Sequence, residues 1–145
     1  MTIFAKNTKF LMPMLRFLSY SLALTIIIAL SGCTESKVYK IGVSQCSQDD
    51  WRKKMNDEIN REIMFHEDAV VEIRSPDDSN TKQIEDIRYF VKNGFDIIIV
   101  SPNEAAALTP VIKDVYENGT PVLIFDRNII GDSYTARIGV DDEGI

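Results

Sequence analysis

The amino-acid sequence predicts an α/β domain of three layers, in which a parallel β-sheet lies between two layers of helices. From residue 38 onward, apolar runs typical of strands alternate with segments whose apolar residues recur every three or four positions, as in amphipathic helices. One run, Ile97 to Val100, is apolar throughout, which is typical of a strand buried on both faces in a parallel sheet. Two helix-like segments end in Asn-Gly, at Asn93-Gly94 and Asn118-Gly119, a common signal for the end of a helix.

The first strand and helix are predicted between residues 38 and 66. Val38 to Ser44 has the composition of a strand, and Ser47-Gln-Asp-Asp50 resembles a capping box with Asp in place of the usual Glu or Gln. Apolar residues then recur at every fourth position and predict the buried face of a helix: Trp51, Met55, Ile59 and Ile63. His66, the only histidine, is expected to cap this helix or to face solvent.

Two more strand–helix units follow, and two further strands complete the sheet. Ala69 to Ile73 and Phe95 to Val100 are the second and third predicted strands. Apolar spacing predicts the buried faces of the two intervening helices: Ile84, Ile87 and Val91 in the first, and Ala105, Leu108, Ile112, Val115 and Tyr116 in the second. The fourth strand begins at Pro121, where a missing N–H is tolerated, and the fifth covers Tyr134 to Val140.

Residues 1–32 are predicted to form a lipoprotein signal peptide. A basic start without acidic residues leads into the apolar stretch from Phe17 to Leu30. This stretch is shorter than the roughly 20 residues that span a membrane, and it matches the apolar core of a secretory signal. The segment ends in Leu30-Ser-Gly-Cys33, which resembles the bacterial lipobox, so Cys33 is the expected lipidation site; an uncleaved signal anchor is the alternative.

The remaining sequence is predicted to contain a tether and one folded domain. Residues 33–38 form the tether, and residues 39–145 form the domain. A helix is expected to follow the fifth strand and would begin near Ile145, where the sequence ends. We therefore interpret the domain as truncated.

The charge balance argues against nucleic acid as a partner. The chain has 16 Lys and Arg against 22 Asp and Glu, and its net charge of −6 becomes −9 without residues 1–32. Such a chain repels phosphate backbones and anionic lipid headgroups, so only the lipid on Cys33 would hold it at a membrane. Cys46 is then the one remaining cysteine and is expected as a free thiol, and neither a metal site nor a cofactor site is predicted.

Polar side chains follow the last two predicted strands where those strands end. Asp126-Arg127 comes after the fourth strand, and Asp141-Asp142 comes after the fifth. Open α/β folds bind ligands at the carboxyl edge of the sheet, where these residues are expected. A carboxylate only accepts hydrogen bonds and a guanidinium only donates them, so together they suit a neutral polyhydroxyl molecule. The pattern predicts sugar binding without catalysis.

Most of the domain resembles the sugar-binding branch of the type I periplasmic binding proteins, whose fold also forms the effector domain of LacI-type repressors. The matching segments are Tyr39 to Ser44, Gly94 to Pro102, Gly119 to Arg127 and Ile138 to Asp142. Cys46 to Arg52 is also similar to the sensor domains of hybrid two-component histidine kinases of Bacteroidetes. The resemblance implies the N-terminal lobe of such a protein, with strand order 2-1-3-4-5, and a second lobe that this sequence does not include.

The resemblance also implies a role for each candidate binding residue. Asp126 accepts hydrogen bonds from ring hydroxyls, Arg127 donates to a hydroxyl or to the ring oxygen, and Trp51 stacks on the face of the sugar. By the same resemblance, Ser44 and Gln45 line the floor of the cleft, and Ser101 lies where the family often has a polar contact. Asp142 is at a position often occupied by Asn in the family.

Each of these roles has a structural alternative. Trp51 continues the apolar stripe of its helix and is alternatively part of the core. Asp126 and Arg127 alternatively form a solvated ion pair. Ser101 alternatively caps the helix that follows it, and the acidic residues after the fifth strand alternatively favour the start of a helix through its dipole.

Two functions follow from these expectations. The first is an exported, lipid-anchored solute-binding protein of the periplasm that recognises a monosaccharide or small carbohydrate for uptake through an ABC permease. The second is the periplasmic sensor lobe of a sugar-responsive hybrid histidine kinase. Enzymes fit less well, because Gly42 alone makes no dinucleotide site and no Gly-x-Ser-x-Gly elbow is present. The third strand ends in Ser101, where a phosphoacceptor receiver domain has an aspartate.

Overall fold

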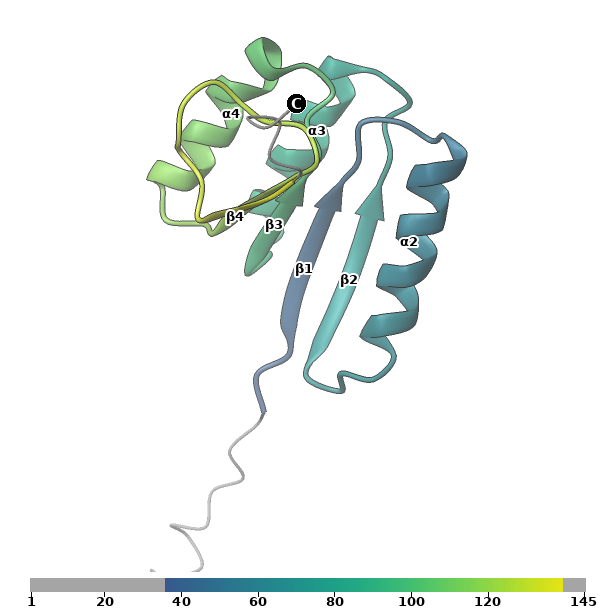
Figure 1. The fold of residues 1–145 in the computed structure, drawn as a ribbon. Coiled ribbons are helices and arrows are strands. Elements are labelled where there is room, and N and C mark those ends of the chain that lie inside the picture. Colours follow the sequence, from purple (N-terminus) through teal and green to yellow (C-terminus); the bar gives the residue numbers. More distant parts are fainter. Residues whose placement is uncertain (1–35, 140–145) are drawn as a thin grey trace, which may run out of the picture. The chain divides into compact units, whose positions relative to one another are not determined.

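The computed structural model describes residues 36–139, and from Lys37 onward these belong to one compact unit (Figure 1). The predicted signal peptide, Cys33 and Asp142 lie outside the described residues. Strands and helices alternate along the chain: β1 Tyr39–Ser44, α2 Asp50–Ile63, β2 Ala69–Arg74, α3 Asn80–Lys92, β3 Ile97–Val100, α4 Ala105–Glu117, β4 Val122–Phe125 and β5 Ala136–Ile138. The predicted strands and the helices between them are therefore confirmed, although β5 is shorter at both ends and β3 begins two residues later. The helix expected after the fifth strand lies outside the described residues.

The strands form one parallel sheet in the order β2-β1-β3-β4-β5, as the resemblance implied. Ile41 pairs with Val71 on one side and with Ile97 on the other, so β1 lies inside the sheet. The chain passes from β1 out to β2 and then back across β1 to β3, which reverses its direction along the sheet. Because parallel crossovers are right-handed, α2 covers one face, whereas α3 and α4 cover the other (Figure 1).

The hydrophobic core lies between the sheet and the pair formed by α3 and α4. Alternate residues of β3 and β4 point into this core and are buried: Ile98, Val100, Val122 and Ile124. Their neighbours along the strands are only half-buried, because they point to the face where α2 lies over β2. The third strand was predicted to be buried on both faces. Among the described residues, this prediction is wrong for the face on the side of α2.

Gly42 allows α3 to pack closely on β1. A Cβ atom at this position would lie 2.6 Å from Cγ of Phe90, a distance too short for real Cβ contacts. Phe90 is fully buried, and its ring centroid lies 4.8 Å from that of Phe95. The Phe90 ring therefore fills the space that a side chain at position 42 would need.

The structure confirms where α3 and α4 were predicted to end, but it confirms only part of their predicted buried faces. Gly94 and Gly119 follow α3 and α4 with φ of 67° and 88°, the left-handed conformation that Asn-Gly predicted. Val91 and Tyr116 were predicted to face inward but are exposed. Ile87 is buried as predicted, and Phe90 takes the core position that was predicted for Val91.

The start of α2 differs from the prediction. Its N-cap is Asp49 and not Ser47, because Asp49 Oδ1 accepts a hydrogen bond of 2.9 Å from the backbone N–H of Arg52. Trp51 is 56% exposed, so its assignment to the core is wrong. The first turn of the helix lies at the carboxyl edge of the sheet, where the Trp51 ring stacks on Phe125 at the end of β4. Met55 begins the part of the helix that faces the strands.

The isolated polar residues are placed much as expected. His66 is exposed, with Nε2 3.3 Å from Glu62 Oε1. Cys46 carries a free thiol, which is completely buried. Among the helices of residues 36–139, none has the length and hydropathy of a membrane span.

Candidate ligand-binding site

An ion pair connects the first turn of α2 with the end of β4. The guanidinium of Arg52 donates from Nη2 to Asp126 Oδ2. The side chain of Arg52 is only 3% exposed, whereas that of Asp126 is 40% exposed. The Asp126 carboxylate is thus held from below by a buried cation and remains open to solvent on its other side.

The backbone at Asp126 is itself unusual. Its φ is 63°, in the left-handed region that Asp and Asn tolerate better than most residues. Its N–H donates to the carbonyl of Ile138 at 2.8 Å, which ties the end of β4 to β5. This turn ends the strand and directs the following residues over the edge of the sheet.

A chain of hydrogen bonds continues the ion pair into the end of β1. Arg52 Nη1 lies 3.5 Å from Oε1 of Gln45, and Gln45 Nε2 donates to Asn56 Oδ1 at 2.8 Å. Gln45 is fully buried. The predicted residue Gln45 therefore lies beneath the edge, where its amide orients the guanidinium of Arg52.

Two aromatic rings lie beside the ion pair. The rings of Trp51 and Phe125 are stacked, with centroids 6.1 Å apart and planes 19° from parallel. The guanidinium of Arg52 lies 4.6 Å from the centroid of the Trp51 ring, within the range of a cation–π interaction. Trp51 thus keeps a large exposed surface close to the carboxylate of Asp126.

Arg127 points to the neighbouring loop. Its Nη1 donates to the carbonyl of Asn103 at 3.0 Å, and the residue is otherwise exposed. The predicted alternative of an ion pair between Asp126 and Arg127 is wrong, because Asp126 pairs with Arg52. A guanidinium has five N–H donors, so Arg127 has further donors for a ligand.

Ser44 and Ser101 end neighbouring strands but do not reach the surface. Both are buried, and Ser101 Oγ lies 3.8 Å from Cys46 Sγ. Ser44 Oγ has no hydrogen-bond partner among the described residues. The prediction that Ser101 caps the next helix is wrong, because the N-cap of α4 is Glu104, three residues later.

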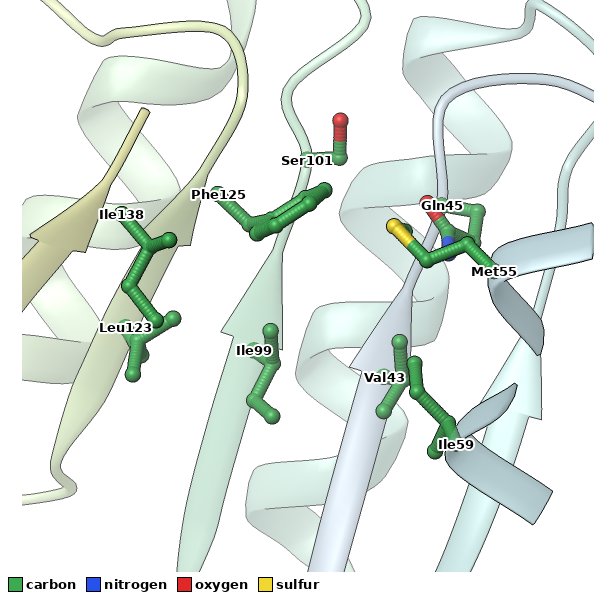
Figure 2. A pocket seen from close by; sticks show the side chains of 9 residues that line it. All are labelled: Val43, Gln45, Met55, Ile59, Ile99, Ser101, Leu123, Phe125 and Ile138. Atoms are coloured by element: carbon green, nitrogen blue, oxygen red, sulfur yellow. The ribbon is translucent and has the colours of Figure 1, made fainter. Parts of the chain in front are cut away.

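Below the edge, a cavity of about 220 Å³ lies on the α2 face of the sheet (Figure 2). Its lining is almost wholly apolar: Val43, Met55, Ile59, Ile99, Leu123, Phe125 and Ile138, with Gln45 and Ser101 at the end nearest the carboxyl edge. Burying hydroxyls there without hydrogen-bond partners would cost free energy. A sugar therefore fits the polar edge above the cavity better than the cavity itself.

Of the predicted ligand-binding residues, Trp51, Asp126 and Arg127 lie at the carboxyl edge and remain exposed. Three more are buried beneath this edge: Ser44, Gln45 and Ser101. Asp142 lies outside the described residues, and the structure adds Arg52 to the site. Sequence reasoning missed Arg52, whose only sequence signal is its place beside Trp51 at the start of a helix. Among residues 36–139, no cluster of His, Cys, Asp or Glu has the arrangement of a metal site.

Strand order 2-1-3-4-5 with a polar carboxyl edge is typical of open α/β folds that bind ligands at that edge. A model of the periplasmic binding protein domain matches residues 41–145, and the chain belongs to that family.

Three relatives place the chain more closely. It is 54% identical to the fructose-binding periplasmic domain of a hybrid two-component system, with a TM-score of 0.70 over 71% of this chain and 34% of that one. It is 26% identical to an ABC transporter solute-binding protein from Bacillus halodurans with bound myo-inositol, with a TM-score of 0.69 over 74% and 38%. It is 27% identical to the D-xylose-binding periplasmic protein of Haemophilus influenzae, over 86% of this chain and 39% of that protein. The chain therefore spans little more than a third of the length of these relatives.

Proposed function

We propose that this lobe binds a monosaccharide or a similar small polyhydroxyl molecule at the carboxyl edge of its sheet, without catalysis. The grouping of Asp126, Arg127 and Trp51 at that edge carries the proposal. The carboxylate accepts hydrogen bonds from hydroxyl groups, and the guanidinium donates to hydroxyl oxygens. The exposed ring of Trp51 provides an apolar surface for the C–H face of a sugar. Relatives named for fructose, D-xylose and myo-inositol support this class of ligand.

The other predicted residues complete the site in this proposal. Gln45 forms its floor through the hydrogen bond to Arg52. Ser44 and Ser101 support the strand ends from below, where they are buried. Asp142 adds a contact from the end of the last strand.

We place the protein in the periplasm, exported by residues 1–32 and anchored by a lipid on Cys33. Either of two roles uses the same ligand site: delivery of the sugar to an ABC permease, or sensing for a fused or associated histidine kinase. Identity of 54% to the periplasmic domain of a hybrid two-component system supports the sensor role. Identity of 26% to an ABC transporter solute-binding protein supports the uptake role.

Trp51 provides the test of ligand binding, because it is the only tryptophan and lies at the proposed site. D-fructose, D-xylose, L-arabinose and myo-inositol are titrated into the purified chain while its fluorescence and its ¹H–¹⁵N NMR spectrum are recorded. We expect weak binding, since one lobe supplies only part of the contacts. A saturable change that Asp126→Asn weakens and Lys113→Gln, on the exposed side of α4, leaves unchanged supports the proposal. Spectra unaffected by all four compounds at high concentration contradict it.

Anchoring and biological role need separate measurements. Mass spectrometry of the chain isolated from bacterial membranes is expected to find an acylated Cys33 at the N-terminus, and Cys33→Ser should release the chain from the membrane fraction. The coding sequence downstream separates the two roles. A membrane helix followed by kinase motifs supports the sensor, whereas a stop after a second lobe supports the uptake protein.

A further inference from the structure

We propose that Arg52 is a positioning residue of the ligand site, which orients the Asp126 carboxylate and supplies its counter-charge without touching the ligand itself. The inference rests on the proposed function, and it concerns how this edge of the sheet is organised before a ligand arrives.

Burial keeps Arg52 away from any ligand at the edge. Its side chain is 3% exposed, and its two terminal nitrogens are directed at Gln45 Oε1 and Asp126 Oδ2. Its backbone N–H is bound by Asp49 Oδ1 at 2.9 Å, so the residue is fixed from both ends. Arg52 thus acts on the site only through the groups that it contacts.

One carboxylate oxygen of Asp126 accepts a hydrogen bond within the chain, and the other can accept one from a ligand. Arg52 binds Oδ2, and no described residue donates a hydrogen bond to Oδ1. Since the carboxylate is 40% exposed, Oδ1 is accessible to a hydroxyl group from outside. The guanidinium fixes the rotation of the carboxylate and therefore the direction in which Oδ1 points.

Two consecutive residues of α2 meet two consecutive residues at the end of β4. Trp51 stacks on Phe125, and Arg52 pairs with Asp126. The guanidinium also lies 4.6 Å from the centre of the Trp51 ring. The aromatic surface and the carboxylate are therefore held as one unit, with Arg52 in contact with both. Because Trp51 is also stacked on Phe125, loss of Arg52 should disturb the Asp126 carboxylate and leave the ring in place.

The alternative is that Arg52 itself donates a hydrogen bond to the sugar after Asp126 moves aside. The two roles differ in a double-mutant comparison. A residue that acts only through Asp126 has nothing left to position in an Asp126→Asn background, whereas a residue that contacts the sugar still contributes there.

The test compares Arg52→Gln, Arg52→Lys, Asp126→Asn and the double variant Arg52→Gln/Asp126→Asn in the purified chain. D-fructose is titrated into each, and binding is followed by ¹H–¹⁵N NMR. We expect Arg52→Gln to weaken binding about tenfold or more, as expected for loss of a hydrogen bond to a charged group. Arg52→Lys, which keeps the charge, should recover part of the affinity. The double variant should bind no more weakly than Asp126→Asn alone.

Arg61→Gln is the matched control, because Arg61 is an exposed arginine near the other end of α2 that pairs with Glu58. Unchanged affinity in Arg52→Gln overturns the inference, and so does a further loss of affinity in the double variant. A well-dispersed spectrum of Arg52→Lys keeps the test valid if Arg52→Gln does not fold.

A readout without sugar separates this inference from the proposed function. In the ligand-free chain, Arg52→Gln should shift the backbone amide signals of Asp126 and Arg127 and increase their mobility, whereas Arg61→Gln should not. If wild type binds none of the four compounds, the proposed function fails and this measurement still decides the role of Arg52. Unchanged signals for Asp126 and Arg127 overturn the inference.

Discussion

Gln83 donates a hydrogen bond of 2.8 Å from Nε2 to the backbone carbonyl of Ser101, which joins α3 to the end of β3. Gln83 is fully buried, and its Oε1 accepts a hydrogen bond of 2.9 Å from the backbone N–H of Asn103. The carbonyl of Asn103 in turn accepts from Arg127. One buried amide from α3 therefore supports the loop against which Arg127 rests.

Gln83→Leu is expected to destabilise the fold by about 1–3 kcal/mol, because it leaves buried backbone groups without partners. The groups affected are the carbonyl of Ser101 and the N–H of Asn103. Urea unfolding followed by circular dichroism measures the effect. Gln48→Leu makes the same chemical change at an exposed glutamine that reaches Ser75, and we expect it to be nearly neutral. Equal stability of the two variants would contradict the role assigned to Gln83.

A larger residue in the middle of β1 should also destabilise the domain. In Gly42→Ala the added methyl group would lie 2.6 Å from Cγ of Phe90, so either the ring or helix α3 must move. We expect a loss of about 1–3 kcal/mol, as is usual when a packed core is overfilled. Thermal unfolding checks the size of the loss. Gly42→Ala combined with Phe90→Leu should be less destabilised than the sum of the single variants, and simple additivity would show that the two positions do not compete for space.

The strand order and most elements could be predicted, because the information is local or lies in a strong family resemblance. Apolar runs predicted the strands, and Asn-Gly predicted the ends of α3 and α4. The exposure of Trp51 could not be predicted from spacing, since periodicity identifies a helix face but not how far the helix extends past the sheet. Because α2 begins beyond the end of β1, Trp51 in its first turn lies at the edge of the sheet and stays 56% exposed.

The ion pair between Arg52 and Asp126 could not be predicted from the sequence, for a different reason. Arg52 and Asp126 are 74 residues apart, and they meet only because β1 and β4 both flank β3 in the sheet. Arg127, the neighbour of Asp126 in sequence, was the more obvious partner, but the left-handed backbone at Asp126 directs the two side chains to different groups. Pairing across a sheet edge depends on turn geometry, which residue types do not specify.

The stability of α2 should depend on pH through its N-cap. The hydrogen bond from the Ser47 side chain, followed by that from the backbone N–H of Arg52, lowers the pKa of Asp49 below its ordinary value. Because the pKa is lower in the folded state than in the unfolded state, the stabilisation is fully present above the ordinary pKa of the carboxyl group and is lost as pH falls through the lowered one. Urea midpoints measured from neutral to acidic pH follow this loss.

Two variants separate the charge of Asp49 from its capping role. Asp49→Asn keeps a good N-cap residue, so it should stay folded at neutral pH and show a weaker dependence on acid. Ser47→Ala removes the side-chain donor and leaves the pKa of Asp49 less depressed, so the acid-dependent loss should be smaller and should be complete at a higher pH. An acid dependence in Asp49→Asn equal to that of wild type would assign it to other carboxyl groups.

The half-covered face of the sheet should bind the dye anilinonaphthalene sulfonate, because apolar side chains of four strands meet there in a cavity of about 220 Å³. Ile138 is 54% exposed at the open side of this cavity, so Ile138→Thr should reduce the dye fluorescence. Ile130→Thr is the control, since Ile130 is an equally apolar, exposed residue that does not line the cavity. Equal fluorescence of the two variants would place the dye elsewhere. If a longer form of the protein covers this face with a further helix, its fluorescence should fall below that of the present chain, and Ile138→Thr should then change it little.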